Sequence, residues 1–412
     1  MIIRQEIKDF ENLGFGMFVH FGAYSVLGKG EWAMQRYAIS PADYRQYVDA
    51  FCPEPDWAER LVDAAKAAGC KYITLTTRHH DGFSLYDTCG LNEYDTVHTC
   101  GRDLVREFVS ACNARGIIPF FYHTLLDWYD PRYNVDFSAY LQFLRESVKL
   151  LCTNYGKIGG LWFDGKWNKP DADWEEDDLY GTIRQYQPDC LIINNTGLHH
   201  LGQAGHPELD GVTYERGMPT PRDQTGAPKY LAGEMCEVFG EHWGYAREDL
   251  NYRSPAYFIK ELVNCRKVGA NMLMNVGPMA NGYLRPIDAA ILEIMGQWVS
   301  YFDESIRRPR PCNVALKETG SDSNFLLQDG KNYYLFCFDI PIGGHTDVTL
   351  NLGKLRCHWA RFDLKERIRE AYWMDNREAV FFEQNGVDTV IHTVPFEYGR
   401  NLVVRVAKIV CE

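Results

Sequence analysis

The residue of this chain best placed to do chemistry is Asp164. It ends the run Leu161-Trp162-Phe163 and is followed by Gly165. A short apolar run of this kind predicts a buried β-strand. A carboxylate where such a strand ends is typical of the active-site face of an α/β barrel. The pattern also fits an Asp that begins a turn or caps a helix, and this segment alone does not decide between the two.

Polar side chains follow other predicted strands in the same way. A single His at such a place is most often structural, but several at successive strand ends indicate a shared site. These residues are His20, Glu31, Trp32, His79, His80, Tyr122 and His123.

A metal site is disfavoured by the spacing of these residues. His79 and His80 are adjacent, and neighbouring side chains of a strand point to opposite faces, so both can hardly bind one ion. The chain has no HxH or HExxH spacing. Hydrogen bonds to the hydroxyls of a neutral ligand suit His, Glu, Trp and Tyr better, and we expect no metal.

Carboxylates among many aromatic residues point to glycoside hydrolysis. The chain lacks a GxSxG elbow and a P-loop, so esterase and nucleotide-hydrolase functions have no support. Glycoside hydrolysis needs one carboxylate as nucleophile or base and one carboxylic acid that protonates the leaving oxygen. Asp164 is the candidate for the first role. Candidates for the second are Glu215, Glu234, Glu237 and Glu241, of which we interpret Glu237 and Glu241 as surface residues.

These side chains must be positioned by alternating strands and helices, which continue to about residue 308. Predicted strands cover residues 16–22, 72–77, 117–123, 160–164, 191–195, a stretch near 234, and 271–276. Predicted helices cover residues 56–68, 104–115, 137–155, 254–268 and 286–302. Seven or eight such units in about 300 residues favour an α/β fold, a (β/α)8-type (TIM-like) barrel over residues 1–308. The region 196–229 is poor in pattern.

The pattern changes after the proline- and arginine-rich segment 307–311. Short alternating runs then predict a C-terminal antiparallel β-sandwich over residues 309–412. Asp329-Gly330 is a hairpin signal between two of the runs. The predicted strands are residues 324–328, 333–338, 348–352, 370–373, 379–382, 389–392 and 402–406.

Composition excludes some partners. The 412 residues are 46% hydrophobic and 14% aromatic, with a net charge of −13, which argues against nucleic acid. No run of about 18 apolar residues predicts a membrane span. The 13 Cys lack a CxxC pair, and the N-terminus lacks the pattern of a signal peptide, so we expect a cytoplasmic location. A trimmed secretion signal and the oligomeric state are left open.

Several distinctive segments follow one another between about residues 10 and 306. They are FGMFVHFG (15–22), GEW (30–32), KYITLTTRHHDGF (71–83), YHTLLDW (122–128), LWFDG (161–165), EMC (234–236), WGY (243–245) and GANMLMNVGP (269–278). In these segments the chain resembles glycoside hydrolase family 29, the α-L-fucosidases. Glu234 precedes Trp243 by nine residues, as in that family.

This resemblance implies a retaining exo-α-L-fucosidase that removes terminal fucose from an oligosaccharide or glycoconjugate, with no metal or organic cofactor. Asp164 matches the nucleophile. Glu234 aligns best with the acid/base, and Glu215 is the second choice. The residues that match those holding the sugar hydroxyls are His20, Glu31, Trp32, His79, His80 and Tyr122, and Trp162 either lines the pocket or packs in the core.

One position departs from the family. Thr196 follows Asn194-Asn195 where the family often has an Arg that reaches the sugar. Arg216 or Arg222 could supply the guanidinium, or either could be a surface charge. Two alternatives to the fucosidase therefore stay open: an enzyme for a related glycoside such as an α-L-galactoside, and a carbohydrate-binding protein without turnover.

Overall fold

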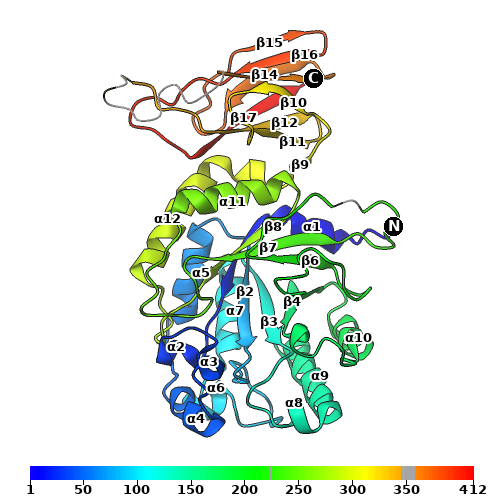
Figure 1. The fold of residues 1–412 in the computed structure, drawn as a ribbon, viewed down its shortest axis with the longest axis vertical. Coiled ribbons are helices and arrows are strands. Elements are labelled where there is room, and N and C mark those ends of the chain that lie inside the picture. Colours follow the sequence, from blue (N-terminus) through cyan, green and yellow to red (C-terminus); the bar gives the residue numbers. More distant parts are fainter. Residues whose placement is uncertain (223, 345–346, 348–357) are drawn as a thin grey trace. The chain divides into compact units, whose positions relative to one another are not determined.

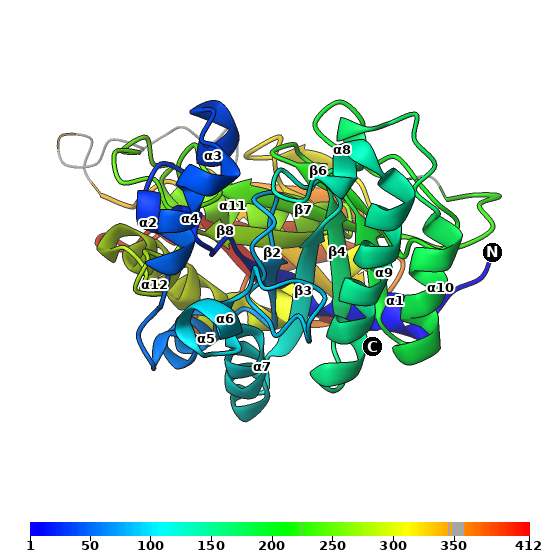
Figure 2. The same ribbon diagram turned by 90° about the horizontal axis from the view of Figure 1, so that it is seen from below.

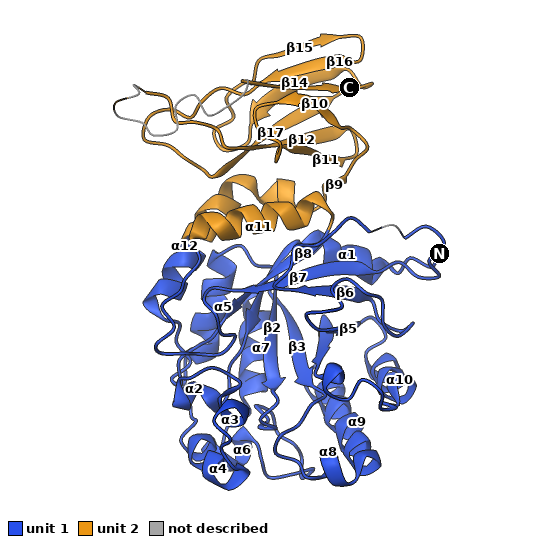
Figure 3. Ribbon diagram, viewed as in Figure 1, with its two compact units in different colours: residues 1–253, 270–293 blue, residues 254–269, 294–412 orange. Residues whose placement is uncertain are grey.

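The computed structural model describes residues 1–222, 224–344, 347 and 358–412. The chain forms two compact units (Figure 3). The first contains residues 1–253 and 270–293, and the second contains residues 254–269 and 294–412. A domain boundary at residue 308 stays a prediction.

The first unit is built on a closed barrel of parallel strands in the order β1 to β8 (Figure 1), which confirms the predicted barrel. Closure comes from β1 and β8, where Phe15 pairs with Met272. The strands are β1 (Phe15–Val19), β2 (Tyr72–Arg78), β3 (Ile118–Thr124), β4 (Gly160–Asp164), β5 (Leu191–Asn194), β6 (Gly211–Glu215), β7 (Ala232–Val238) and β8 (Asn271–Val276).

Helices connect these strands, and α5, α7, α9 and α10 lie outside the strands in Figure 2. The side chain of Asp103 caps α7 by accepting from the backbone N–H of Arg106, and Gly116 ends this helix with a positive φ. The helices are α1 (Gln5–Leu13), α2 (Tyr24–Leu27), α3 (Ala33–Arg36), α4 (Pro41–Asp49), α5 (Trp57–Ala67), α6 (Thr96–Cys100), α7 (Leu104–Arg115), α8 (Arg132–Val135), α9 (Phe137–Asn154), η1 (Lys166–Asn168) and α10 (Glu176–Tyr186).

Strand β6 is the barrel strand that the sequence pattern missed. It is five residues long, begins with Gly211 and lies between irregular segments. Its register with β7, in which Thr213 pairs with Glu234 and Glu215 with Cys236, determines how deep each acidic side chain lies in the barrel.

Large aromatic side chains fill the barrel interior. Trp162, Tyr122 and Phe18 belong to one buried cluster. Glycines make room for further rings, because a Cβ on Gly160 would lie 2.4 Å from the ring of Phe120. Such crowding is typical of a closely packed core.

The second unit contains α11 (Pro255–Lys267), the later part of α12 (Pro286–Phe302), η2 (Asp303–Ile306) and two antiparallel sheets. One sheet has the order β10-β13-β16-β15 and the other β14-β17-β12-β11-β9. The strands are β9 (Arg310–Pro311), β10 (Leu316–Thr319), β11 (Phe325–Asp329), β12 (Asn332–Phe338), β13 (Trp359–Asp363), β14 (Ile368–Trp373), β15 (Phe382–Asn385), β16 (Asp388–His392) and β17 (Val404–Cys411).

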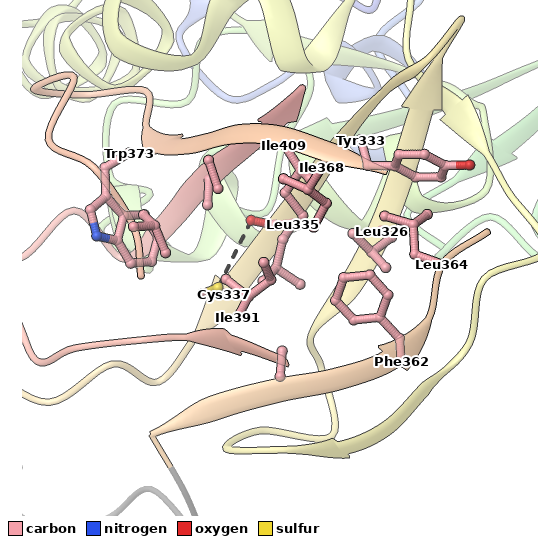
Figure 4. Packing of buried hydrophobic residues seen from close by; sticks show 14 of the residues in the cluster. Leu326, Tyr333, Leu335, Cys337, Phe362, Leu364, Ile368, Trp373, Ile391 and Ile409 are labelled. Carbon is pink, nitrogen blue, oxygen red and sulfur yellow. Dashed lines mark hydrogen bonds between the residues drawn. The ribbon is translucent and has the colours of Figure 1, made fainter. Parts of the chain in front are cut away.

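Side chains from both sheets share one core, including Leu335, Phe362 and Ile391 (Figure 4). The predicted β-sandwich is therefore confirmed, and Asp329 pairs with Asn332 across the expected hairpin.

Two predicted strands of the sandwich need comment. The strand predicted at 379–382 is instead β15, because Asn385 pairs with Asp388 across a turn in which Gly386 has φ +63°. The strand predicted at 348–352 lies outside the described residues.

Candidate active site

A cavity of about 940 Å³ lies where the barrel strands end. It brings together residues from successive strand ends, as the sequence predicted. The predicted site residues that line it are His20, Glu31, Trp32, His79, His80, Tyr122, Trp162, Asp164 and Glu215.

Asp164, at the end of β4, is surrounded by hydrogen-bond donors. Its Oδ1 accepts from Trp167 Nε1 at 3.0 Å and from Asn195 Nδ2 at 3.2 Å. Its Oδ2 accepts from the Tyr122 hydroxyl at 3.1 Å and lies 3.5 Å from His80 Nε2. Burial raises the pKa of Asp164, but these partners, His80 first, outweigh burial and hold the pKa below its usual value. This carboxylate is therefore ionised at neutral pH.

Glu215 ends β6 and shares one hydrogen-bond donor, Asn195, with Asp164. Asn195 Nδ2 donates to Glu215 Oε2 at 2.8 Å as well as to Asp164. The Asn195 amide is held in this orientation because its Oδ1 accepts from Thr213 Oγ1 and from the N–H of Gly197. Burial, followed by the charge of Asp164, raises the pKa of Glu215 to about 7. The site thus pairs an ionised carboxylate with a carboxylic acid.

His20, just after β1, is a neutral imidazole with a defined tautomer. Asn275 donates its Nδ2 to the carbonyl of Trp243, so its Oδ1 must accept from Nδ1 of His20 at 2.7 Å. Burial lowers the pKa of His20 to about 3. Its Nε2 is therefore an acceptor for a ligand hydroxyl.

The imidazole of His79 has a buried nitrogen, Nδ1, without a hydrogen-bond partner among the described residues. Burial, followed by the charges of His80 and His20, lowers the pKa of His79 well below its usual value. A buried polar atom of this kind is costly unless a ligand or water binds it.

Aromatic rings enclose the cavity. Trp162 is stacked with Tyr122 at 5.7 Å between ring centroids and lies edge-on to Phe18 at 5.1 Å. Nearer the solvent, Trp32 is stacked with Trp167 at 5.9 Å. Faces of apolar rings beside polar groups are typical of a sugar-binding site.

A sequence profile of the family described as "Alpha-L-fucosidase" matches residues 3–304. This chain belongs to the α-L-fucosidase family. Members of the family are glycoside hydrolases, so the predicted enzyme class is confirmed.

Individual fucosidases resemble most of the chain. The tissue α-L-fucosidase of Homo sapiens is 27% identical over 401 residues, covering 86% of this chain and 81% of the human protein. The solved structure of α-L-fucosidase isoenzyme 1 from Paenibacillus thiaminolyticus is 29% identical, with a TM-score of 0.81 and 99% of each chain covered. A covalent intermediate trapped in the family 29 α-L-fucosidase of Bacteroides thetaiotaomicron has a TM-score of 0.80 at 21% identity, covering 98% of this chain and 96% of that one. The last likeness shows the fold.

Glu234, the first choice from the sequence for the acid/base, lies elsewhere. It is 2% exposed, does not line the cavity, and accepts from the Tyr72 hydroxyl at 2.5 Å and from Trp162 Nε1 at 3.0 Å. Glu234 pairs with Thr213, two residues before Glu215 on β6, and its partner Tyr72 is the first residue of β2. Glu234 therefore lies deeper in the barrel than Glu215. Burial raises its pKa to about 7, but the structure places Glu215, not Glu234, beside Asp164.

The other acidic candidates are also outside the cavity. Glu241 is exposed, as expected. Glu237 was expected on the surface but is 3% exposed, because it lies on β7 and faces Arg253 at 3.9 Å.

Thr196 stands where the family often has an Arg, and its hydroxyl donates to the carbonyl of His200. Arg216 lines the cavity and lies over the ring of Trp243 at 5.5 Å. Arg222 donates to the carbonyl of Leu231 and does not line the cavity.

The sequence pattern missed two residues that contact Asp164, namely Asn195 and Trp167. Asn195 directly follows β5, so the strand-end rule that identified Asp164 applies to it as well. Trp167 follows Asp164 by three residues, which marks it as part of the same strand-end loop.

Two further observations concern the described residues only. No cluster of three or more His, Cys, Asp or Glu among them has the arrangement of a metal site. None of their helices combines the length and apolar character needed to cross a membrane.

Proposed function

We propose that this chain is a retaining exo-α-L-fucosidase that hydrolyses terminal α-L-fucose from fucosylated oligosaccharides or glycoconjugates. The observation that supports retention of the anomeric configuration is that Asn195 contacts both Asp164 and Glu215. One amide nitrogen lies 3.2 Å from Asp164 Oδ1 and 2.8 Å from Glu215 Oε2, so these two oxygens are at most about 6 Å apart. Retaining enzymes keep their carboxyl groups about 5–5.5 Å apart, whereas inverting enzymes need about 6.5–9.5 Å.

The proposed first step is attack of an Asp164 oxygen on the anomeric carbon. The bond to the leaving oxygen breaks, and Glu215 transfers its proton to that oxygen. An ester then links the sugar to Asp164. In the second step Glu215, now ionised, removes a proton from water, the water oxygen attacks the anomeric carbon, and Asp164 is released. The raised pKa of Glu215 and the lowered pKa of Asp164 suit these starting states.

The proposed sugar contacts follow from the residues that line the cavity. Nε2 of His20 would accept from a hydroxyl, and the His79 ring, which lines the cavity, would contact the sugar. Glu31, Trp32, His80 and Tyr122 complete the polar lining, and Trp162 with Phe18 forms an apolar wall. The apolar wall suits the carbon-6 methyl group of fucose.

The relatives support this proposal without deciding the substrate. The human relative is a tissue α-L-fucosidase, and the Bacteroides enzyme was trapped as a covalent intermediate with a fluorinated fucosyl fluoride. A covalent intermediate is what a retaining mechanism requires.

The test is hydrolysis of aryl α-L-fucoside and aryl α-L-galactoside by the wild type and by Asp164→Ala, with the anomer of the first sugar product followed by NMR. We expect release of α-L-fucose by the wild type and loss of turnover in the variant. Release of the β-anomer would overturn the retaining mechanism. Faster cleavage of the galactoside would instead favour the alternative substrate, since an apolar pocket rejects an added hydroxyl only weakly.

A further inference from the structure

Two cysteines of the first unit lie side by side outside the cavity. Cys52 follows α4 by three residues, and Cys100 is the last residue of α6. These two helices are neighbours (Figure 1), and the side chains of the two cysteines are in hydrogen-bonding contact. Cys52 is exposed and Cys100 is half-buried, and neither lines the cavity. The pair is therefore open to solvent without being part of the proposed sugar site.

Arg102 holds the two cysteine-bearing segments together. Its guanidinium donates to the carbonyl oxygens of Pro53 and Glu54, the two residues after Cys52. The same guanidinium contacts the Cys52 side chain itself. Because Arg102 follows Cys100 by two residues, these bonds keep the two sulfurs close to each other. A cation beside an exposed sulfur is also the environment in which cysteines react.

The two thiols differ in what they can do. Burial, followed by the contact with Cys52, raises the pKa of Cys100 to about 12, so Cys100 stays a thiol at neutral pH. The thiolate is the form of cysteine that attacks an oxidant. Cys52 is exposed beside a guanidinium and is therefore the residue that an oxidant meets first. Cys100 lies where a second thiol can trap the oxidised sulfur.

We propose that Cys52 and Cys100 are a redox-active pair, which hydrogen peroxide or another hydroperoxide converts to a reversible disulfide. The Cys52 sulfur attacks one peroxide oxygen, the O–O bond breaks, and the departing hydroxide leaves as water with the proton of the Cys52 thiol. Cys52 is then a sulfenic acid. The Cys100 sulfur attacks the Cys52 sulfur, the S–O bond breaks, and hydroxide leaves as water with the Cys100 proton. Two thiols are oxidised, and one hydrogen peroxide is reduced to two waters.

The local backbone favours closure of this bond. Cys52 lies in no helix or strand, and the Gly101 that follows Cys100 ends α6 with φ +70°. Both sulfurs can therefore approach by rotation of side chains at the ends of elements. The disulfide closes residues 52–100 into a loop that contains α5, β2 and the pair His79 and His80. Exchange with an added thiol reopens the loop.

Cys89 provides a control within the same chain. It is exposed, as Cys52 is. Its sulfur contacts the carbonyl oxygen of Asp87 at 3.7 Å and the side-chain amide of Asn154 at 3.8 Å, not a second thiol. Burial, followed by the negative charge of Asp87, raises the pKa of Cys89. If exposure alone decided reactivity, Cys52 and Cys89 would be oxidised alike, whereas the pair predicts a disulfide at Cys52 only.

The experiment treats the full chain with hydrogen peroxide, alkylates the remaining thiols, and maps the peptides by mass spectrometry without reduction. In the wild type we expect two peptides joined through Cys52 and Cys100, lighter by two hydrogens than their sum and separated by dithiothreitol. Cys100→Ser removes the second thiol, so dimedone should label a sulfenic acid at Cys52. Cys52→Ser should leave Cys100 as an alkylated free thiol, and Cys89→Ser should form the disulfide as the wild type does.

The other outcomes overturn the pair. Peroxide that oxidises Cys89 while Cys52 and Cys100 stay free would show that exposure alone determines the reaction. Oxidation of Cys52 to a sulfinic acid in the wild type, without a disulfide, would show that Cys100 does not reach it. Equal dimedone labelling of Cys52 in the wild type and in Cys100→Ser would show the same. The bond is detected by mass, so each result is independent of whether the chain cleaves fucosides.

Discussion

The indole N–H of Trp162 donates to the carboxyl of Glu234 at 3.0 Å, inside the barrel. The same carboxyl accepts from Tyr72, so Glu234 ties strand β4 to strand β2 beneath the cavity. Trp162 in turn is stacked with Tyr122, which donates to Asp164. Glu234 therefore contacts the site through the ring of Trp162, and we expect it to support that ring rather than to transfer a proton.

Replacement of Glu234 tests this assignment. Glu234→Gln keeps an acceptor for Trp162 and should retain most activity, with a pH profile like that of the wild type. Glu234→Leu leaves the indole N–H unpaired, and should cost about 1–3 kcal/mol of unfolding free energy and raise KM more than it lowers kcat. Steady-state kinetics and denaturant unfolding measure both. If Glu234→Gln instead lost turnover of substrates with poor leaving groups, Glu234 would be the acid/base after all.

Glu215→Gln should impair substrates according to their leaving group. General acid catalysis contributes about 100- to 10,000-fold, so turnover of fucosyllactose should fall by that order. An aryl fucoside with an activated leaving group needs less proton transfer and should lose much less in its first step. Burst kinetics of nitrophenol release separate the two steps. A uniform loss on both substrates would contradict the assignment.

The pH dependence follows from the two carboxyls. Glu215 must be protonated, and with its pKa raised to about 7 the active form is lost as pH rises through 7. Asp164 must be ionised, and its pKa lies below its usual value of about 3.9, so the loss on the acid side begins below about pH 4. The kcat/KM profile should be flat between these limits. A basic limb that persists unchanged in Glu215→Gln would show that another group causes it.

Asn195→Ala should move the basic limb to higher pH. The hydrogen bond from Asn195 lowers the pKa of Glu215, so its removal lets burial and the charge of Asp164 raise that pKa further. Turnover should also fall, because the spacing of the carboxyls is no longer fixed. Thr213→Val removes only one anchor of the Asn195 amide and should give a smaller shift in the same direction. A shift to lower pH would contradict this account.

Gly160→Ala should destabilise the barrel. The added Cβ would lie 2.4 Å from the Phe120 ring and 3.0 Å from the carbonyl of Leu191, and overpacking of a core typically costs about 1–3 kcal/mol. Gly181→Ala on α10 is the matched control, since nothing lies within 4 Å of its Cβ and Ala is favoured in a helix by about 1 kcal/mol. Denaturant unfolding of both variants checks the prediction, and equal stability changes would refute it.

The sequence predicted the barrel, the sandwich and the strand-end residues of the cavity such as His20 and Asp164, because apolar runs that end in polar residues are local patterns. It did not predict which Glu accompanies Asp164. Glu215 and Glu234 lie on neighbouring strands and both point inward, but depth is set by the register between β6 and β7. Register depends on pairing across the barrel, which no local pattern of β6 contains.

The register of β6 and β7 also determines which position of β7 lies level with the proposed proton donor of β6. Cys236 is level with Glu215, faces the same cavity and lies two residues beyond Glu234. Two residues correspond to about 7 Å along a strand. An acidic side chain at position 236 would thus reach the height at which the leaving oxygen departs, while one at 234 stays under the aromatic layer. The height of an acidic side chain along its strand, and not the strand that carries it, therefore decides whether it can reach the leaving oxygen.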